Sequence, residues 1–303
     1  MKRRIESTTS RTAEWICMSR AISSLEENPC YKSDDHLALV LLPASIKFLI
    51  SIPAIRRFFI KKMPAKGIYE YIIARTKYFD AVFKEALTEG FDQILLFGAG
   101  FDTRALRFAS LAGRVKVFEL DVPHTQNAKI SQYRSRKLAV PPNLIFIPID
   151  FDKESLPDKL ESAGFEKNRR SLFVLEGLLM YLQQESVDET FRVIRSFAGK
   201  GSEVVFDYVY ASVLRGEGLY EDEKAMAEKV AKAGEKWSFG IEKGTIESFL
   251  GQYDLKLLDE KDASGLEEMY FAPCRTTGGR NGSSTGAAGL VHGTHCLVRA
   301  RRE

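Results

Sequence analysis

Two glycines that follow a short apolar run predict a ligand-binding turn. The run Ile94–Phe97 has the length of a buried strand, Gly98 and Gly100 come directly after it, and a segment with helical character follows. Glycine permits positive φ and lets a ligand approach the backbone, and the first N–H groups of a helix are free to donate. Because Thr103 replaces the third glycine of the dinucleotide fingerprint, a tight strand–helix connection without a ligand is an equal alternative.

Acidic residues stand at the ends of three further apolar runs. Glu119 and Asp121 end the second run, Asp150 and Phe151 follow the third, and Glu176 follows the fourth. The carboxyl ends of parallel strands share one edge of a sheet, and ligands bind at that edge. Any one of these acids could instead cap a helix. Their recurrence at three successive strand ends favours a binding site.

The chemistry of these side chains suits an adenosine ligand that also carries an ammonium group. A carboxylate about 20 residues after a glycine turn fits a ribose diol, and Asp121 stands at that distance, with Glu119 as the rival. Asp150 is suited to the adenine amino group and Phe151 to the face of the ring. Glu176 is suited to an ammonium, which S-adenosylmethionine carries and a dinucleotide lacks.

The elements that must position these residues change in character near residue 89. Residues 1–88 have helical periodicity interrupted by Pro43, Pro53 and Pro64, and Asp34 or Asp35 is expected to cap a helix that begins near Leu37. From Ile94 onward, strand and helix patterns alternate, which predicts an α/β protein with a doubly wound, mostly parallel sheet. The expected strands are Ile94–Phe97, Val115–Leu120, Leu144–Ile149, Leu172–Leu175, Glu203–Tyr208, 253–261 and 295–301.

Helices are expected between these strands, and two late segments have a different pattern. The charged segment Glu217–Lys236 is expected to form an exposed, mobile helical insert. The stretch 273–293 is rich in Gly, Ser and Thr, which predicts a flexible loop. The expected helices are Thr103–Leu111, Thr125–Leu138, Leu156–Ala163 and Ser186–Phe197.

Three motifs, in this order and spacing, resemble the leucine carboxyl methyltransferase superfamily, and more closely its bacterial and archaeal branch of S-adenosylmethionine-dependent methyltransferases. They are Phe97-Gly-Ala-Gly-Phe-Asp-Thr-Arg, Phe118-Glu-Leu-Asp-Val-Pro and Glu176-Gly-Leu-Leu-Met-Tyr-Leu. Thr12-Ala13, Arg20-Ala21 and Ala74–Asp80 match that branch as well, and the resemblance runs from about residue 8 to the C-terminus. It implies a Rossmann-like class I methyltransferase with seven strands, helices on both faces, a helical lid (1–88) and a cofactor domain (89–303).

The resemblance also implies a role for individual residues toward S-adenosylmethionine and its product S-adenosylhomocysteine. Without the resemblance, Arg75 would be interpreted as a helix-surface arginine. Tyr181 could equally well be a core tyrosine, and Arg104 could be only the partner of a nearby acid. Tyr181 is implied to line the methyl-transfer site. The implied cofactor contacts are Arg75 to the methionine carboxylate, Gly98 and Gly100 to the methionine part and ribose, Asp121 to the ribose, Asp150 and Phe151 to the adenine, and Glu176 to the amino group.

The expected reaction is methyl transfer to an oxygen, carboxylate or hydroxyl, of a small apolar or amphipathic acceptor. The N-terminal helices are expected to fold over the carboxyl edge of the sheet and form the acceptor pocket, and the apolar content of Leu37–Phe59 suggests an apolar or amphipathic acceptor. A carboxylate is ionised at neutral pH and needs no base, whereas a hydroxyl needs one, and neither His124 nor His292 and His295 is singled out. The alternatives are a nucleotide-dependent oxidoreductase and a non-catalytic S-adenosylmethionine-binding module.

Composition and charge limit the kinds of partner that the sequence predicts. The net charge is +3 and the basic residues are scattered, which argues against nucleic acid. Leu37–Ile55 is too broken for a membrane span and is expected to be a core or lid helix, so no membrane partner is predicted. The four cysteines lack Cys-x-x-Cys spacing and are expected to be reduced thiols in a cytoplasmic protein. No metal site is predicted, and the expected state is a monomer or weak homo-oligomer.

Overall fold

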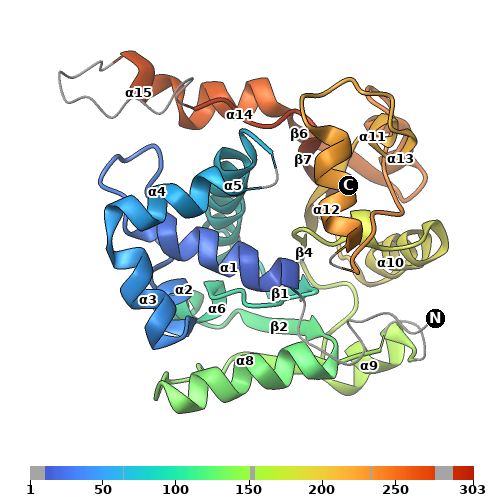
Figure 1. Cartoon of the computed structure of the whole chain (residues 1–303). Coiled ribbons are helices and arrows are strands. Elements are labelled where there is room, and N and C mark those ends of the chain that lie inside the picture. Colours follow the sequence, from blue (N-terminus) through green and yellow to red (C-terminus); the bar gives the residue numbers. More distant parts are fainter. Residues whose placement is uncertain (1–10, 64, 151–153, 233, 277–288) are drawn as a thin grey trace.

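A computed structural model describes residues 11–63, 65–150, 154–232, 234–276 and 289–303 of the chain. Five helices precede the sheet in this part of the chain (Figure 1): α1 (Arg11–Ser24), α2 (His36–Leu41), α3 (Ala44–Ser51), α4 (Pro53–Lys61) and α5 (Ile68–Thr88). Proline and carboxylate side chains set their boundaries. Pro43 precedes α3, Pro53 is the first residue of α4, and the Asp35 carboxylate caps α2 by accepting from Ala38 N at 3.0 Å.

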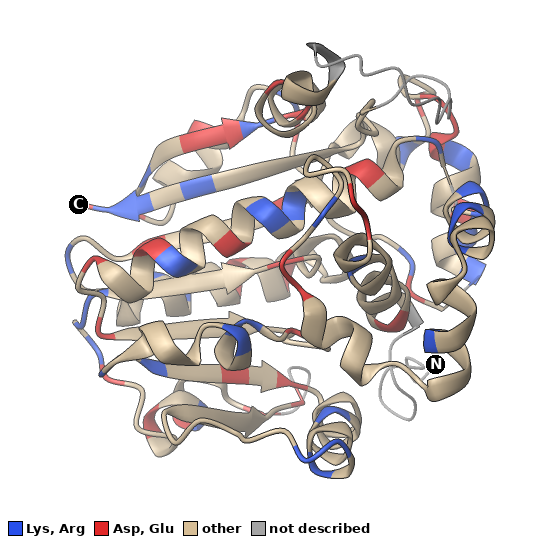
Figure 2. Ribbon diagram, turned by 90° about the vertical axis from the view of Figure 1, so that its left-hand side faces the viewer, with Lys and Arg blue, Asp and Glu red and all other residues tan. Residues whose placement is uncertain are grey.

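The sheet has seven strands in the order β3-β2-β1-β4-β5-β7-β6. The five strands β3, β2, β1, β4 and β5 run parallel to one another, and β7 runs antiparallel to both β5 and β6. The α/β fold class, with helices on both faces of a mostly parallel sheet, is therefore confirmed (Figure 2). The strands are β1 (Gln93–Phe97), β2 (Lys116–Asp121), β3 (Leu144–Pro148), β4 (Ser171–Leu175), β5 (Glu203–Val209), β6 (Leu255–Lys261) and β7 (His295–Arg302).

The connecting helices lie close to their expected positions, with one break. The expected helix 103–111 is two short helices, α6 (Arg104–Arg107) and α7 (Ala109–Ala112), joined at Phe108. The others are α8 (Pro123–Ser135), α9 (Leu156–Ser162), α10 (Gln184–Phe197), α11 (Ala211–Arg215), α12 (Glu223–Lys232), α13 (Ile246–Gly251), α14 (Ala263–Tyr270) and α15 (Ala272–Thr276), with a 3₁₀ turn at Leu179–Tyr181. No helix in the described ranges is both long and apolar enough to cross a bilayer.

The central strands form the main core. Every residue of β1, β4 and β5 is buried, as expected for parallel strands covered on both faces. The long helix α5 buries most of its length and contributes to this core and to a second cluster formed with α1, α2 and α3. It therefore joins the N-terminal helices to the sheet.

Two late segments differ from their sequence-based predictions. The insert 217–236 is not simply exposed, because α12 buries Met226, which is 2% exposed. In the predicted loop 273–293, α15 occupies the beginning, and Val291 and His292 are buried near its end. Residues 277–288 lie outside the described residues. The described parts of both segments are ordered because they pack against neighbouring elements. Amino-acid composition does not reveal such contacts.

The prediction of four reduced cysteines is wrong for one pair. Cys30 and Cys274 form a disulfide between residues 244 positions apart, while Cys17 and Cys296 are free and buried. Packing of the segment after α1 against the end of α14 brings the pair together, as seen in the contact of the Tyr31 and Phe271 rings, with centroids 5.2 Å apart. Spacing in the sequence could not reveal this long-range contact.

Candidate active site

A cavity of about 1250 Å³ opens at the carboxyl edge of the parallel strands. It is larger than the roughly 300–1,000 Å³ typical of a pocket for one small ligand, so it has room for two. The predicted site residues that line it are Arg75, Gly98, Gly100, Asp121, Asp150, Glu176 and Tyr181. Phe151 lies outside the described residues. Of the N-terminal helices, α1 and α5 line the cavity together with α12, whereas no residue of Leu37–Phe59 does, so the apolar content of that segment gives no evidence on the acceptor.

The glycine turn and Asp121 form one unit at the floor of the cavity. Gly98 and Gly100 both have positive φ, at 58° and 47°. A Cβ at Gly98 would come 3.0 Å from a methyl carbon of Leu178, and the positive φ would strain a residue with a side chain at this position. The Asp121 carboxylate accepts from the amides of Gly100 and Val122 and keeps further lone pairs for a ligand. Burial raises its pKa to about 6, and the two amide hydrogen bonds oppose that rise.

Glu119, the rival of Asp121, lies outside the cavity lining. It stands two residues earlier on the same face of β2, where α8 covers the strand, and its carboxylate pairs with Lys129 of α8 at 2.7 Å. Both side chains are 1% exposed. Burial raises the pKa of Glu119 to about 7, against the effect of Lys129. Glu119 is therefore a buried acid paired with Lys129, and it does not line the cavity that Asp121 lines.

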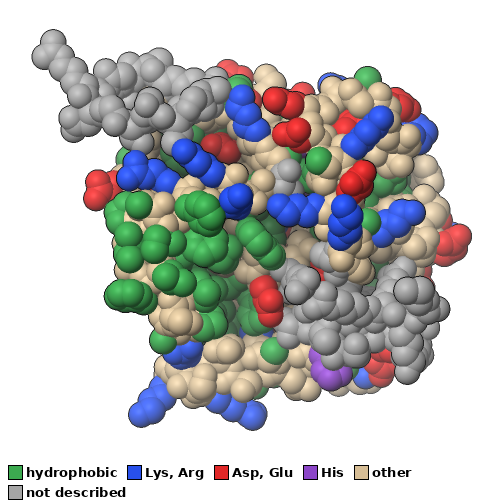
Figure 3. Space-filling view, in the orientation of Figure 1, with side chains coloured by type: hydrophobic (Ala, Val, Ile, Leu, Met, Phe, Trp, Pro, Cys, Tyr) green, Lys and Arg blue, Asp and Glu red, His purple; other side chains and the backbone are tan. Residues whose placement is uncertain are grey.

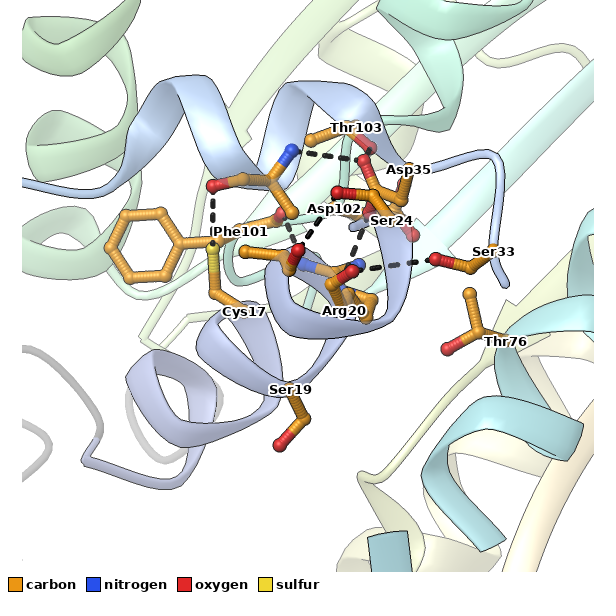
Figure 4. A network of polar contacts seen from close by, with 12 residues as sticks. Cys17, Ser19, Arg20, Ser24, Ser33, Asp35, Thr76, Phe101, Asp102 and Thr103 are labelled. Carbon is orange, nitrogen blue, oxygen red and sulfur yellow. Dashed lines mark hydrogen bonds and ion pairs between the residues drawn. The ribbon is translucent and has the colours of Figure 1, made fainter. Parts of the chain in front are cut away.

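A continuous chain of buried ion pairs runs behind the glycine turn. Figure 4 shows its beginning, where Arg20 of α1 meets Asp35 at 3.4 Å and donates to the Phe101 carbonyl at 2.6 Å. From Asp35 the chain continues through arginines and carboxylates of α5, α6 and β5 and through Glu176, which follows β4. The successive pairs are Asp35–Arg107, Arg107–Asp80, Asp80–Arg104, Arg104–Glu176, Glu176–Arg75 and Arg75–Asp207, with Asp102 as a branch on Arg104.

This chain places a net negative charge beside the cavity. Four arginines face five carboxylates in these ion pairs, which leaves one negative charge in excess. Glu176 and Arg75 both line the cavity and pair with each other at 3.1 Å, so they form a joint contact for a zwitterion. A Cβ on Gly177 would come 3.0 Å from Nη1 of Arg75, so glycine is needed for this approach. The excess charge suits a cationic ligand.

The opposite part of the cavity is aromatic and apolar. Tyr181 lies beside Trp237 and Thr12, and burial raises the pKa of its phenol. Other apolar lining residues are Ile16, Met63, Met226 and Val230. An acceptor with an apolar body fits this lining.

His295 also lines the cavity, and a chain of hydrogen bonds fixes its tautomer. Its ring stacks on Tyr71 with centroids 4.4 Å apart, and Nδ1 lies 2.8 Å from Thr294 Oγ1. His292 Nδ1 lies 2.8 Å from the same hydroxyl, and His292 Nε2 lies 2.8 Å from the Glu221 carbonyl. Burial lowers the pKa of both histidines, that of His295 strongly, so both rings are neutral at pH 7.

The direction of each hydrogen bond follows from the carbonyl at the end of the chain. A carbonyl only accepts, so His292 Nε2 carries the proton and His292 Nδ1 must accept from the Thr294 hydroxyl. That hydroxyl can then only accept from His295, so His295 Nδ1 carries the proton. The lone pair of His295 is therefore on Nε2, which has no hydrogen-bond partner within the described ranges.

Comparison with known proteins agrees with this geometry. The family model for leucine carboxyl methyltransferases matches residues 13–195, which include the glycine turn, Asp121 and Glu176. The chain belongs to the leucine carboxyl methyltransferase family. Its fold resembles solved proteins from Streptomyces avermitilis (a DUF574 family protein; TM-score 0.59, 14% identity, 99% of this chain and 100% of that one) and Thermobifida fusca (a "putative methyltransferase"; 0.57, 18%, 94% of each).

Relatives in sequence carry methyltransferase names. A Bacillus subtilis protein named "Putative S-adenosyl-L-methionine-dependent methyltransferase YktD" is 29% identical over 66% of each chain. A Mycolicibacterium smegmatis protein with a name of the same form is 28% identical over 74% of this chain and 73% of its own length. A similarly named Mycolicibacterium vanbaalenii protein is 32% identical over 54% of this chain and 51% of its own length. The matched region thus spans between half and three quarters of these relatives.

Sequence reasoning missed several residues that line the cavity of this family member or support its lining. His295 follows a loop-like stretch, but β7 is antiparallel, so its first residue lies opposite Val209 at the end of β5 and thus at the carboxyl edge. Asp207, the partner of Arg75, and Tyr71, which donates to Asp207 at 2.6 Å, are interior residues of β5 and α5. A buried acid within the apolar run of β5 was the available signal for Asp207.

Proposed function

We propose that this chain is an S-adenosylmethionine-dependent methyltransferase that methylates an oxygen of a small acceptor with an apolar body. One observation carries the proposal. A single cavity joins a glycine turn with Asp121, a negatively charged floor and an aromatic part that contains His295. The family to which the chain belongs and the names of its relatives support the same activity. The division into a helical lid (1–88) and a cofactor domain (89–303) within one structural unit is part of this proposal.

The residues present fit the cofactor at each of its polar groups. Asp121 has lone pairs for the ribose hydroxyls, and Asp150, which follows β3 and lines the cavity, would contact the adenine. Glu176 and Arg75 offer opposite charges to the amino and carboxylate groups of the methionine end. When bound, S-adenosylmethionine supplies an electrophilic methyl group on a sulfonium. The excess negative charge beside the glycine turn favours that cation over the neutral product.

His295 would accept the proton of a hydroxyl acceptor. The bound cofactor would supply the methyl group and leave as S-adenosylhomocysteine, with the electron pair of the carbon–sulfur bond on sulfur, and His295 Nε2 would take the proton that the acceptor hydroxyl loses. A hydroxyl becomes strongly acidic as its oxygen gains the methyl group, so a base with a lowered pKa still accepts the proton. Tyr181 and Trp237 would hold the acceptor and exclude water.

The first experiment is calorimetric titration with S-adenosylmethionine and S-adenosylhomocysteine, with NADH as a third ligand. We expect saturable one-to-one binding of the first two. Binding of NADH alone would favour the oxidoreductase alternative, and binding of none by the folded protein would overturn the proposal. A methyl-release assay with matched phenols, alcohols and carboxylic acids then tests the acceptor. Cofactor binding without turnover of any acceptor would favour the non-catalytic module.

A further inference from the structure

Large apolar side chains are exposed on the hairpin of α3 and α4, outside the cavity. Phe48 is 69% and Phe58 57% exposed, and Leu49 and Ile52 lie between them at 37% and 38%. Figure 3 shows a broad apolar area over these helices, on the left of the molecule. Monomeric soluble proteins rarely expose contiguous apolar patches of this kind without a partner. The segment Leu37–Ile55, predicted as a core or lid helix, is divided among α2, α3 and the start of α4, and it leaves Phe48 in solvent.

The charged residues of the segment that forms this apolar face have one sign. From His36 to Tyr69 the chain contains six Lys and Arg residues and no Asp or Glu. Arg56 pairs with Glu26 at 3.9 Å and donates to backbone carbonyls, so it is largely used within the fold. The remaining five have no acidic partner among the described residues: Lys47, Arg57, Lys61, Lys62 and Lys66. Basic side chains border the apolar area in Figure 3.

We propose that the α3–α4 face docks onto the surface of a membrane that contains anionic lipids. Exposed aromatic and aliphatic side chains flanked by lysine and arginine are typical of helices that lie in the interface plane, with the apolar side chains in the headgroup boundary. The basic flanks complement anionic headgroups. The two helices have 8 and 9 residues, far fewer than the roughly 20 needed to span a bilayer, so the contact is peripheral.

The same charges argue against other occupants. Symmetric contact between two copies would bring one set of basic side chains against the other, and like charges in close contact are unfavourable. A nucleic acid would use the charges but leave Phe48 and Phe58 without an apolar partner. A bilayer surface satisfies both features, so we revise the expectation of no membrane partner to exclude only a span.

The docking face borders the mouth of the cavity. Met63 follows α4 and lines the cavity, and Lys229 of α12, also in the lining, donates to the Lys62 carbonyl at 3.2 Å. An amphipathic molecule leaving the bilayer would therefore meet the cavity close to the docking face. Membrane docking itself does not depend on the proposed methyl transfer.

The test is flotation of the full chain with vesicles of phosphatidylcholine alone and of phosphatidylcholine with phosphatidylglycerol. We expect binding to the anionic vesicles only, weakening as salt rises. The double variant F48S/F58S and the charge reversal K61E/K62E should each weaken binding by about tenfold or more. The matched control is L258S/M269S, which changes two exposed apolar residues on β6 and α14 and should bind as the native chain does.

Three outcomes would overturn the proposal. They are no binding to anionic vesicles, binding that F48S/F58S leaves unchanged, and a concentration-dependent dimer in size-exclusion chromatography with light scattering that F48S/F58S abolishes. The last would assign the face to a second copy. Circular dichroism and titration with S-adenosylmethionine on the same variants separate a loss of docking from a loss of folding or cofactor binding.

Discussion

Asp121 and Glu119 show how position along one strand separates an acid that lines the cavity from an acid in the core. Both lie on the same face of β2, both are buried, and burial raises the pKa of each. Asp121 is held by two backbone amides and opens on the cavity, whereas Glu119 is closed off by Lys129. The sequence placed both acids at the strand end, and only the position of α8 distinguishes them.

The raised pKa of Asp121 predicts that cofactor affinity depends on pH near 6. Only the ionised carboxylate accepts both ribose hydroxyl protons, so the Kd should be low above pH 6 and rise toward about tenfold per pH unit below it. D121N should weaken binding at pH 8 and remove this dependence, while E166Q, at an exposed acid, should change neither. Calorimetry between pH 5 and 8 measures both, and a native Kd that is independent of pH would contradict the ribose assignment.

The same group has the opposite effect on stability. Its folded pKa of about 6 exceeds the ordinary value of 3.8, so the folded state binds more protons between these pH values. This contribution to stability is present below about pH 4 and is lost as pH rises through 6. Cofactor affinity and unfolding free energy should therefore change in opposite directions across this window as far as Asp121 is concerned.

His295 gives a second prediction, on the chemical step. H295Q should lower kcat for a hydroxyl acceptor by about 10²- to 10⁴-fold, the usual contribution of a general base. The Kd for S-adenosylmethionine should stay close to the native value, since Asp121, Glu176 and Arg75 are unchanged. H36Q, at an exposed histidine on α2, is the matched control. An unchanged kcat for a hydroxyl acceptor would remove His295 from the mechanism, whereas a carboxylate acceptor should be insensitive to it.

At the scale of elements, α5 and the disulfide hold the N-terminal helices against the sheet domain. Helix α5 carries Tyr71 and Arg75, which contact Asp207 of β5, and Asp80, which pairs with Arg104 of α6. The disulfide joins the segment after α1 to α15, at the other end of the sequence. The helix was predictable from its periodicity, but the disulfide was not, because it depends on how α14 and α15 fold back.

Reduction of the disulfide should lower the free energy of unfolding by about 2–4 kcal/mol, since the closed loop restricts the unfolded chain. Urea unfolding with and without dithiothreitol measures this difference. The variant C30S/C274S should unfold at the midpoint of the reduced native chain and should not respond to reductant. Cys17 and Cys296 stay free and buried in that variant, so it also shows whether reductant acts on the protein at any place other than the disulfide. A native midpoint that reductant does not move would show that the bond does not contribute.

At the scale of the whole molecule, local sequence patterns predicted the structural features that depend on a single strand or helix. The glycine turn, the acids at the strand ends and all seven strands were predictable, because apolar runs and their boundaries are local features. The contacts of Arg75 with Asp207 and of His292 with the Glu221 carbonyl join distant segments. They could not be predicted without the antiparallel placement of β7 and the packing of α5.

The ion-pair chain predicts that the N-terminal helices and the sheet unfold together. Asp35 is fully buried and pairs with Arg20 and Arg107, which lower its pKa although burial alone would raise it. D35A would leave both arginines buried without this partner, at a cost of about 3–5 kcal/mol, whereas E166Q at an exposed pair should cost below about 1 kcal/mol. Urea unfolding followed by tryptophan fluorescence reports each region separately in two variants. W237F retains Trp15 of α1, and W15F retains Trp237 at the cavity. Coincident transitions, both shifted by D35A, are expected for one structural unit, and separate transitions would contradict it.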